Sequence, residues 1–328
     1  MIRKFFAALG CAVLGAAVML LALPLLPGQL LPHGRAETLA ATEAETAEPA
    51  DEPFDGAVTL RVLVDGAVRE QTLHDYLVCV LLAEVPSGFA AEALKAQACA
   101  ARTFALRQAG AGKHAEADVC ASAACCQGWC APEQWPEHAA AEAAVTETDG
   151  LAVVYDGQLI DATYFSCSGG RTEAAVAVWG GEIPYLQSVP SPGEEDAPRE
   201  TETLTFTAEE FRDHITPARP DADLSGTPES WFGTVRYTAG GGIGTLELGG
   251  ASFTGTELRR LLGLRSTDIE FSPQEDGVTV TTHGFGHRVG LSQYGAEAMA
   301  QAGRRFDEIL LHYYQGTEIR RLTLDGEK

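Results

Sequence analysis

Residues 76–110 read YLVCVLLAEVPSGFAAEALKAQACAARTFALRQAG, and this stretch predicts two helices with a break between them. The run Tyr76–Ala83 is apolar throughout, which is typical of a buried helix. Asp75 suits the N-cap position of that helix. Pro86 disfavours helical backbone at the residue before it, so the first helix should end there.

The second predicted helix follows Ser87, runs over about Ala90–Gln108 and closes at Gly110. Small side chains dominate it, and they would let it pack very closely against neighbouring elements. These small residues are Ala93, Ala96, Ala98, Ala100, Ala101 and Ala105.

The rest of the chain mixes both structural periods. Val58–Val64 alternates like a strand, and residues 151–165 suggest a hairpin. Residues 203–280 combine a short helix with several strands, and residues 292–314 predict one or two amphipathic helices. No regular βαβ rhythm is present, so we expect an α+β (mixed) fold, with room for a second lobe at about 200–280 beside a groove.

Glu84 is the first residue that calls for a chemical explanation. It lies at the end of the apolar run, on the same side as Leu77, Val80 and Leu81. Partial desolvation and the negative end of the helix dipole would both favour its neutral form. A carboxyl group that keeps its proton near neutral pH is suited to general acid catalysis. The alternative is a glutamate that simply reaches solvent at the helix end.

Arg102 lies on one face of the second helix with Lys95 and Cys99, at spacings i, i+4 and i+7. It could bind a carboxylate or orient a sugar. Equally, it could form a salt bridge that fastens this helix to the rest of the domain.

A cysteine-rich loop follows the second helix. His114, Cys120 and Cys126 have the spacing H-x5-C-x5-C, and imidazole with thiolates suits zinc. Three ligands would leave an open fourth position. Disulfides remain an alternative in an exported protein, and free thiols are a third reading. Cys125 and Cys130 are further thiols in the same loop.

Two glycine-rich stretches, 164–172 and 284–296, supply hydroxyl, amide and aromatic groups of the kind that bind sugars. Neither contains the Gly-Lys-Ser/Thr of a phosphate-binding loop, and no G-x-S-x-G elbow is present. Structural turns packed against the core are the alternative. The candidate substrate-binding residues are Tyr164, Ser166, Ser168, Trp179, His287, Ser292 and Gln293.

The charge balance excludes a nucleic-acid-coating protein. Acidic residues number 46 against 23 basic ones, which gives a formal net charge of −23. Phosphate contacts need clustered Lys and Arg. Acidity of this kind speaks to solubility rather than to a function.

The N-terminal region differs from the rest. After a basic start, Phe5–Pro27 carries no charge, so residues 1–31 predict a single membrane anchor. An acidic linker at 32–52 and an extracytoplasmic domain at 53–328 would follow, which places the protein at the cell membrane. A cleaved signal peptide with a cut near Ala40 is the alternative, and either reading exports the chain.

Several segments together resemble the stage II sporulation protein D (SpoIID) family, which shares its domain with amidase enhancers. The similar segments are Tyr76–Thr103, Cys126–Trp129, Ser166–Thr172, Val178–Leu186, Leu258–Thr267 and Gly284–Ala296. Individually they are modest, but in this order they are specific. The N-terminal anchor is also usual in that family.

The resemblance implies a peptidoglycan lytic transglycosylase that cuts denuded glycan strands and leaves 1,6-anhydromuramoyl ends. The family's catalytic glutamate falls on Glu84. A zinc pattern of some clostridial members falls on His114, Cys120 and Cys126. A cell-wall amidase would be the partner, because it removes the stem peptides first.

This chain departs from the family pattern at Arg288, where glycine is usual, and at Cys167, where Ser or Thr is usual. Two other function classes stay open. One is a non-catalytic wall-binding activator of an amidase. The other is a zinc hydrolase acting on the stem peptide through activated water.

Overall fold

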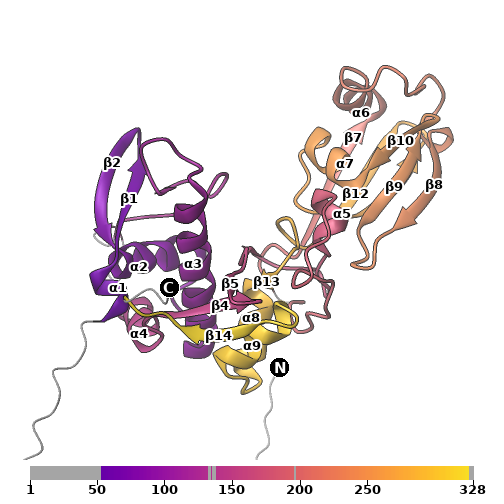
Figure 1. Cartoon of the computed structure of the whole chain (residues 1–328). Helices are drawn as coiled ribbons and strands as arrows, with labels where there is room; N and C mark the ends of the chain where they lie inside the picture. Colours follow the sequence, from indigo (N-terminus) through magenta and orange to yellow (C-terminus); the bar gives the residue numbers. More distant parts are fainter. Residues whose placement is uncertain (1–52, 132–133, 135–137, 196, 325–328) are drawn as a thin grey trace, which may run out of the picture. The chain divides into compact units, whose positions relative to one another are not determined.

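The computed structural model describes residues 53–131, 134, 138–195 and 197–324, and it has the mixed α and β class expected from the sequence (Figure 1). Its α-helices are α1 Phe54–Ala57, α2 Leu73–Glu84, α3 Ala91–Ala111, α4 Ala139–Glu147, α5 Ala175–Trp179, α6 Ala208–Ile215, α7 Gly255–Leu261, α8 Gln293–Gln301 and α9 Phe306–Tyr313. Its strands are β1 Thr59–Val64, β2 Ala67–Thr72, β3 Val119–Cys120, β4 Leu151–Tyr155, β5 Gln158–Leu159, β6 Tyr164–Phe165, β7 Thr201–Thr207, β8 Phe232–Tyr237, β9 Ile243–Leu248, β10 Ala251–Thr254, β11 Asp268–Gln274, β12 Gly277–His283, β13 Leu291–Ser292 and β14 Glu318–Arg321.

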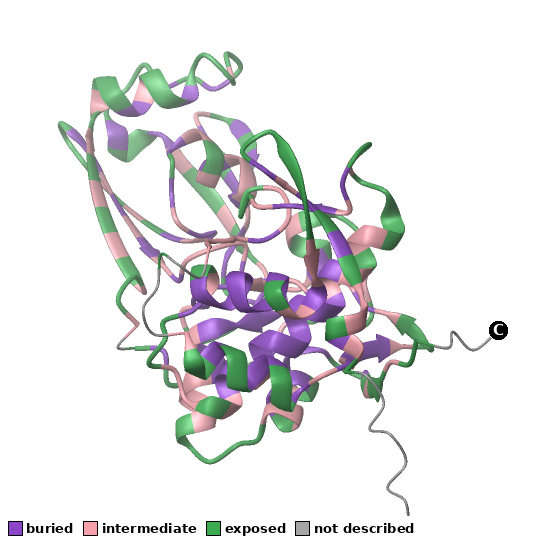
Figure 2. Cartoon of the chain, turned by 90° about the vertical axis from the view of Figure 1, so that its left-hand side faces the viewer, coloured by how far each residue is buried: buried purple, intermediate pink, exposed green. Residues whose placement is uncertain are grey.

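Helix α3 is the central packing element of the helical part. It contacts α2, α4, α8 and α9, and Ala96, Ala98, Ala100 and Ala101 on it are fully buried. Small side chains let neighbouring helix axes approach closely, which explains the alanine-rich sequence. Figure 2 shows buried residues running through the interior helices and exposed residues along the rim.

The two predicted helices exist, but their caps differ from the prediction. Helix α2 begins three residues earlier than expected, because the hydroxyl of Thr72, not Asp75, accepts the bond from the backbone N–H of Asp75 at 3.1 Å. Helix α3 starts after Ala90 without a side-chain cap, so Ser87 does not cap it. Its C-cap is Gly112, which has a left-handed φ of 63°, and not Gly110, which lies inside the helix.

Several small sheets surround these helices. Strands β1 and β2 form a hairpin through Asp65 and Gly66, both with positive φ, and β3 pairs in parallel with β1. The expected hairpin within 151–165 is present as β4 and β5, and β14 joins β4. Strand β6 pairs in parallel with β13, with Phe165 opposite Ser292. This short pair brings the two glycine-rich stretches of the sequence side by side.

Residues 201–283 contain two antiparallel three-stranded sheets, in the orders β10-β9-β8 and β11-β12-β7. Their apolar residues form a core in which every member comes from residues 204–280. Phe211 lies at its centre and stacks on Trp231 with ring centroids 5.7 Å apart. This segment therefore has a hydrophobic core of its own, and the domain boundaries given above stay predictions.

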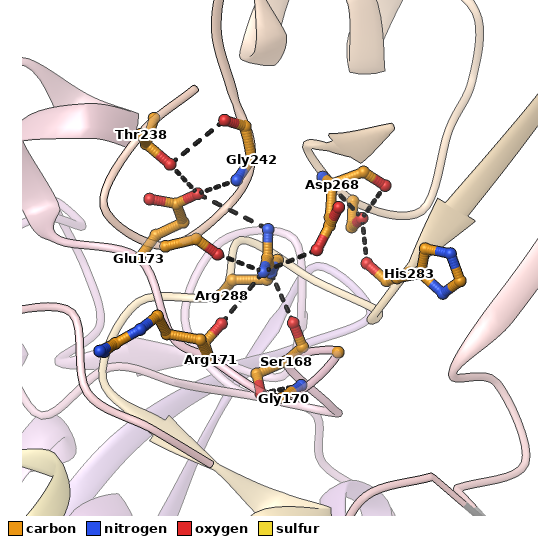
Figure 3. A network of polar contacts seen from close by, with 12 residues as sticks. Ser168, Gly170, Arg171, Glu173, Thr238, Gly242, Asp268, His283 and Arg288 are labelled. Atoms are coloured by element: carbon orange, nitrogen blue, oxygen red, sulfur yellow. Dashed lines mark hydrogen bonds and ion pairs between the residues drawn. The ribbon is translucent and has the colours of Figure 1, made fainter. Parts of the chain in front are cut away.

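Arg288 fixes this segment to the turn after β6 (Figure 3). Its side chain is fully buried and donates to the carbonyl oxygens of Ser168 at 2.7 Å, Arg171 at 3.0 Å and Gly240 at 2.8 Å. It also pairs with Asp268 at 3.1 Å. Its backbone has a φ of +63°, which is unfavourable for a residue other than glycine by about 1–2 kcal/mol. The buried hydrogen bonds of the guanidinium offset that strain.

The predicted anchor at 1–31 and linker at 32–52 lie outside the described residues. Within the described part of the chain, no helix is long and apolar enough to span a bilayer.

Candidate active site

An open cleft of about 820 Å³ contains Glu84. Of the residues predicted from the glycine-rich stretches and their surroundings, Tyr164, Ser166, Trp179, His287 and Gln293 line it. The remaining lining residues are Phe104, Gln108, Lys113, Ala123, Ala124, Cys125, Cys126, Asp161, Thr163, Phe165, Arg199, Phe285 and Gly286. The cleft therefore combines one carboxyl at a helix end with polar and aromatic groups from distant parts of the chain.

Glu84 is the last residue of α2 and is held at both carboxylate oxygens. The backbone N–H of Gly128 donates to Oε1 at 2.5 Å, and the amide of Gln293 donates to Oε2 at 3.5 Å. Desolvation raises the pKa of Glu84 above its usual value, although these hydrogen bonds partly oppose the shift. The result is an oriented carboxyl group that binds its proton more tightly than an exposed glutamate does.

A chain of buried hydrogen bonds fixes the loop that carries Gly128. Tyr76 on α2 donates to the Oε1 atom of Gln127 at 3.0 Å, and the amide of Gln127 donates to the hydroxyl of Tyr164 at 2.9 Å. A Cβ at position 128 would lie 2.9 Å from Oε1 of Glu84, so any residue larger than glycine would displace this carboxyl group. The sequence showed this segment as a motif but gave no sign of its contact with Glu84.

Trp179 and His287 form an aromatic wall of the cleft. The indole of Trp179 is 47% exposed, so its face is free to stack on a sugar ring. The imidazole of His287 lies 5.3 Å from it between ring centroids, and 5.7 Å from Phe165. Burial lowers the pKa of His287 to about 4, so this ring is neutral near pH 7. Its Nδ1 accepts from the N–H of Val289, which leaves the proton on Nε2.

Asp161 is a second carboxyl group in the cleft, and the sequence analysis did not single it out. Burial raises its pKa, while Arg107 and Lys113 lower it through their charges. Its Oδ1 atom is buried and makes no hydrogen bond.

Arg102 does not reach the cleft, so its assignment as a substrate-binding residue is corrected. Its side chain is fully buried and pairs with Asp55 of α1 at 2.5 Å. It also donates to the carbonyl oxygens of Val145 and Leu151 at 3.3 and 2.9 Å. The alternative reading, a salt bridge that fastens α3 to the domain, is the one the structure contains.

Ser168 and Ser292, two of the predicted substrate-binding residues, are also buried and do not line the cleft. Both hydroxyls donate to Glu194, at 2.8 and 2.5 Å. Their place in the glycine-rich stretches made them look like sugar-binding groups. Their hydrogen-bond acceptor, Glu194, lies in a segment in which the sequence analysis found no motif.

The cysteine-rich loop brings four potential metal ligands together. His114, Cys120, Cys125 and Cys126 each offer one ligand atom, and these atoms all lie within 4.8 Å of one another. Zinc–sulfur and zinc–nitrogen bonds of about 2.3 and 2.0 Å fit a cluster of this size. The sequence analysis proposed three of these residues with an open fourth position, and it did not include Cys125 among the potential ligands. The cluster lies beside the site, since Cys125 and Cys126 also line the cleft.

The geometry thus combines the oriented carboxyl group of Glu84 with an open polar cleft and a neighbouring thiol-rich cluster of potential metal ligands. The family model described as SpoIID, Stage II sporulation protein, matches residues 65–155. The chain is 36% identical over 311 residues to stage II sporulation protein D of Bacillus subtilis (strain 168), covering 86% of this chain and 87% of that protein. The chain belongs to the stage II sporulation protein D family.

Two further relatives support this assignment. Stage II sporulation protein D of Bacillus amyloliquefaciens is 35% identical over 299 residues, covering 88% of this chain and 85% of that protein. An amidase enhancer of Bacillus subtilis (strain 168) is 28% identical over 288 residues, covering 72% of this chain but 39% of its own length.

Proposed function

We propose that this protein is a peptidoglycan lytic transglycosylase that remodels the cell wall during sporulation. It would cleave the bond between N-acetylmuramic acid and N-acetylglucosamine in denuded glycan strands. The observation that carries the proposal is Glu84: a carboxyl with a raised pKa, oriented at both oxygens inside an open polar cleft. Membership in a family named for sporulation supports the biological setting.

The reaction needs one carboxyl group that acts twice. Protonated Glu84 donates its proton to the glycosidic oxygen, and the bond from that oxygen to the muramoyl C1 breaks. The resulting carboxylate then takes the proton of the muramoyl O6 hydroxyl as O6 bonds to C1. No water is consumed, and Glu84 returns to its protonated state. A raised pKa favours the first half of this cycle, because it keeps the acid protonated closer to neutral pH.

The surrounding residues would bind and orient the strand. The exposed part of Trp179 offers a stacking surface. Ser166 and Gln293 offer hydroxyl and amide groups in the same cleft as Glu84. The neutral His287 can donate only one hydrogen bond and adds no charge to the cleft. Holding the strand in register lowers the barrier by fixing C1 against O6.

We also propose that the cluster of His114, Cys120, Cys125 and Cys126 binds zinc. Thiolates and imidazole disfavour magnesium and calcium, and four protein ligands are typical of structural zinc sites. With Cys125 in the fourth position, no open position would remain for activated water. When bound, zinc would hold the loop that carries Gly128 in place beside Glu84. This argues against a zinc hydrolase acting on the stem peptide.

The proposed location is the outer side of the cell membrane, with residues 1–31 as a single-pass anchor. A cell-wall amidase is the proposed partner, because it would supply denuded strands. The amidase enhancer among the relatives favours a second candidate function, a non-catalytic activator of such an amidase.

One experiment separates the two functions. The protein is incubated with glycan strands that an amidase has already denuded, and in parallel with intact wall plus the amidase. We expect soluble fragments with anhydromuramoyl ends from the denuded strands, and none from Glu84→Gln. The contrary result would be that the amidase releases peptides faster in the presence of either the wild type or Glu84→Gln, with no glycan cleavage. That result would identify an activator.

A further inference from the structure

Glu194 is a buried carboxylate that the mechanism above does not use. It is 2% exposed, and its five hydrogen-bond donors are all neutral. The donors to Oε2 are the N–H of Ser168 at 2.5 Å, the hydroxyl of Ser168 at 2.8 Å and the N–H of Gly169 at 3.2 Å. The hydroxyls of Ser191 and Ser292 both donate to Oε1 at 2.5 Å.

Four of these five donors, all except the hydroxyl of Ser191, come from the ends of the two parallel strands beside the cleft. Ser168 and Gly169 follow β6, and Ser292 is the last residue of β13. Ser292 also caps α8, because its hydroxyl accepts from the N–H of Gly295 at 3.2 Å. One carboxylate therefore ties together the carboxyl ends of both strands.

The same strand ends present two of the cleft residues. Ser166 follows β6 directly, and Gln293 is the first residue of α8, directly after β13. The N–H of Tyr294 also donates to the carbonyl of Ser166 at 3.0 Å, so the two strand ends are joined on the cleft side as well. Gln293 is the residue that donates to Oε2 of Glu84. The position of this amide depends on how the end of β13 is held.

The space around Glu194 is closed, which leaves the carboxylate a single arrangement. A Cβ at Gly295 would collide with Ser191, Tyr313 and Glu194. The hydroxyls of Ser191 and Tyr313 lie 2.6 Å apart and close the network on the far side. The two backbone N–H groups cannot rotate away, so they require an acceptor at this point.

We propose that Glu194 is a positioning residue for the glycan cleft, and this rests on the proposed function. It locks the ends of β6 and β13 together, and through them it sets where Ser166 and Gln293 stand relative to Glu84. It does not touch the substrate. Without Glu194, the two strand ends would move apart, and Ser166 and Gln293 would no longer be correctly placed relative to Glu84.

The test compares three variants of Glu194 in the full-length protein. Glu194→Ala removes the acceptor, and Glu194→Asp is too short to reach both sets of donors. Glu194→Gln keeps an oxygen for the backbone N–H groups and offers an amide to the hydroxyls, which can turn to accept. At a temperature where circular dichroism shows all variants folded, we expect kcat/KM on denuded strands to fall about 10- to 100-fold for Ala and Asp. Gln should restore it to within about threefold of the wild type.

Asp55→Asn is the matched control, since Asp55 is equally buried but pairs with Arg102, away from the cleft. It should lower the melting temperature without changing kcat/KM of the folded molecules. If Glu194→Ala does not fold, Glu194→Asp carries the test. Wild-type kcat/KM in the folded Ala or Asp variant, or a loss of kcat/KM in Asp55→Asn as large as theirs, would overturn the proposal.

A binding measurement tests the positioning role even if the proposed cleavage activity is wrong. In a Glu84→Gln background, the affinity for denuded strands is measured with and without Glu194→Asp. Weaker binding with Glu194→Asp supports the positioning role even if the wild type cleaves nothing. Unchanged binding, together with unchanged turnover in a wild type that does cleave, removes Glu194 from the cleft's organisation while leaving the proposed function standing.

Discussion

The substitution Gly128→Ala should displace the catalytic carboxyl group of Glu84 while leaving that side chain itself unchanged. A Cβ at this position would lie 2.9 Å from Oε1 and 3.3 Å from the carboxyl carbon of Glu84, so the carboxyl group must retreat by roughly 0.5 Å to reach ordinary contact. The backbone at Gly128 does not have a positive φ, so alanine adds no backbone strain there. Only the end of one flexible side chain has to move. We therefore expect a loss of stability of about 1 kcal/mol, the low end of what overpacking costs.

The effect on catalysis should be much larger than the effect on stability. Displacement lengthens the 2.5 Å bond from the N–H of Gly128, and misplacement on this scale can slow an enzyme by about 10- to 100-fold. That hydrogen bond also lowers the pKa of Glu84, so its loss raises the pKa further. The general acid must be protonated, so cleavage declines as pH rises through this pKa. The decline should therefore move to higher pH in the variant.

The assay is the initial rate of release of soluble glycan from denuded strands, measured across pH, with melting temperature in parallel. Gly88→Ala is the control, because nothing lies within 4 Å of a Cβ there and its φ is not positive. Wild-type rates in a folded Gly128→Ala protein would refute the reasoning. So would an equal loss in Gly88→Ala.

Three further predictions concern Asp161 and the cysteine-rich loop, which both lie beside Glu84 in the cleft. Asp161→Asn should keep at least about a third of the wild-type rate, because a lytic transglycosylase needs one carboxyl group; loss of cleavage would point to a two-carboxylate hydrolase instead. Protein purified under reducing conditions should contain about one zinc, with less in Cys120→Ser and Cys125→Ser and no change in Cys130→Ser, as measured by elemental analysis. Zinc affinity should fall as pH falls, because protons compete for the thiolates, and pH-independent binding would contradict ligation by these cysteines.

The sequence predicted features whose cause is local. The apolar run ending at Glu84 and the alanine-rich helix after it are patterns within one element, and both appear in the structure. Caps were less well predicted, since Thr72 and Asp75 are both good N-cap residues, and in the structure the hydroxyl of Thr72 accepts the capping bond from the N–H of Asp75. The choice between two nearby glycines at the end of α3 was wrong for a similar reason.

Features set by distant partners could not be predicted. Arg102 looks the same in the sequence whether it faces a sugar or Asp55, which lies 47 residues away. Ser168 and Ser292 carry hydroxyl groups of the kind that a sugar site needs, but both hydroxyls donate to the buried carboxylate of Glu194. The contact between Gly128 and Glu84 spans 44 residues, and no spacing rule links them. Cys125 was not proposed as a ligand, because the regular spacing H-x5-C-x5-C from His114 and Cys120 selects the adjacent Cys126.

Arg288 illustrates a departure that the structure explains. The family resemblance led us to expect glycine at this position, and its φ of +63° lies in the left-handed region that glycine adopts without strain. An arginine is tolerated because its guanidinium offsets the backbone strain with buried hydrogen bonds to Ser168, after β6, and to Gly240, between β8 and β9.

Isotope labelling of the products tests the central claim most directly. Denuded strands are cleaved in water enriched in oxygen-18, and the new ends are examined by mass spectrometry. The account predicts anhydromuramoyl ends without the label, because O6 of the sugar and not water attacks C1. It also predicts that Glu84→Gln, folded as well as the wild type, forms these ends at least about 100-fold more slowly. New reducing ends that carry the label, or unchanged cleavage by Glu84→Gln, would contradict it.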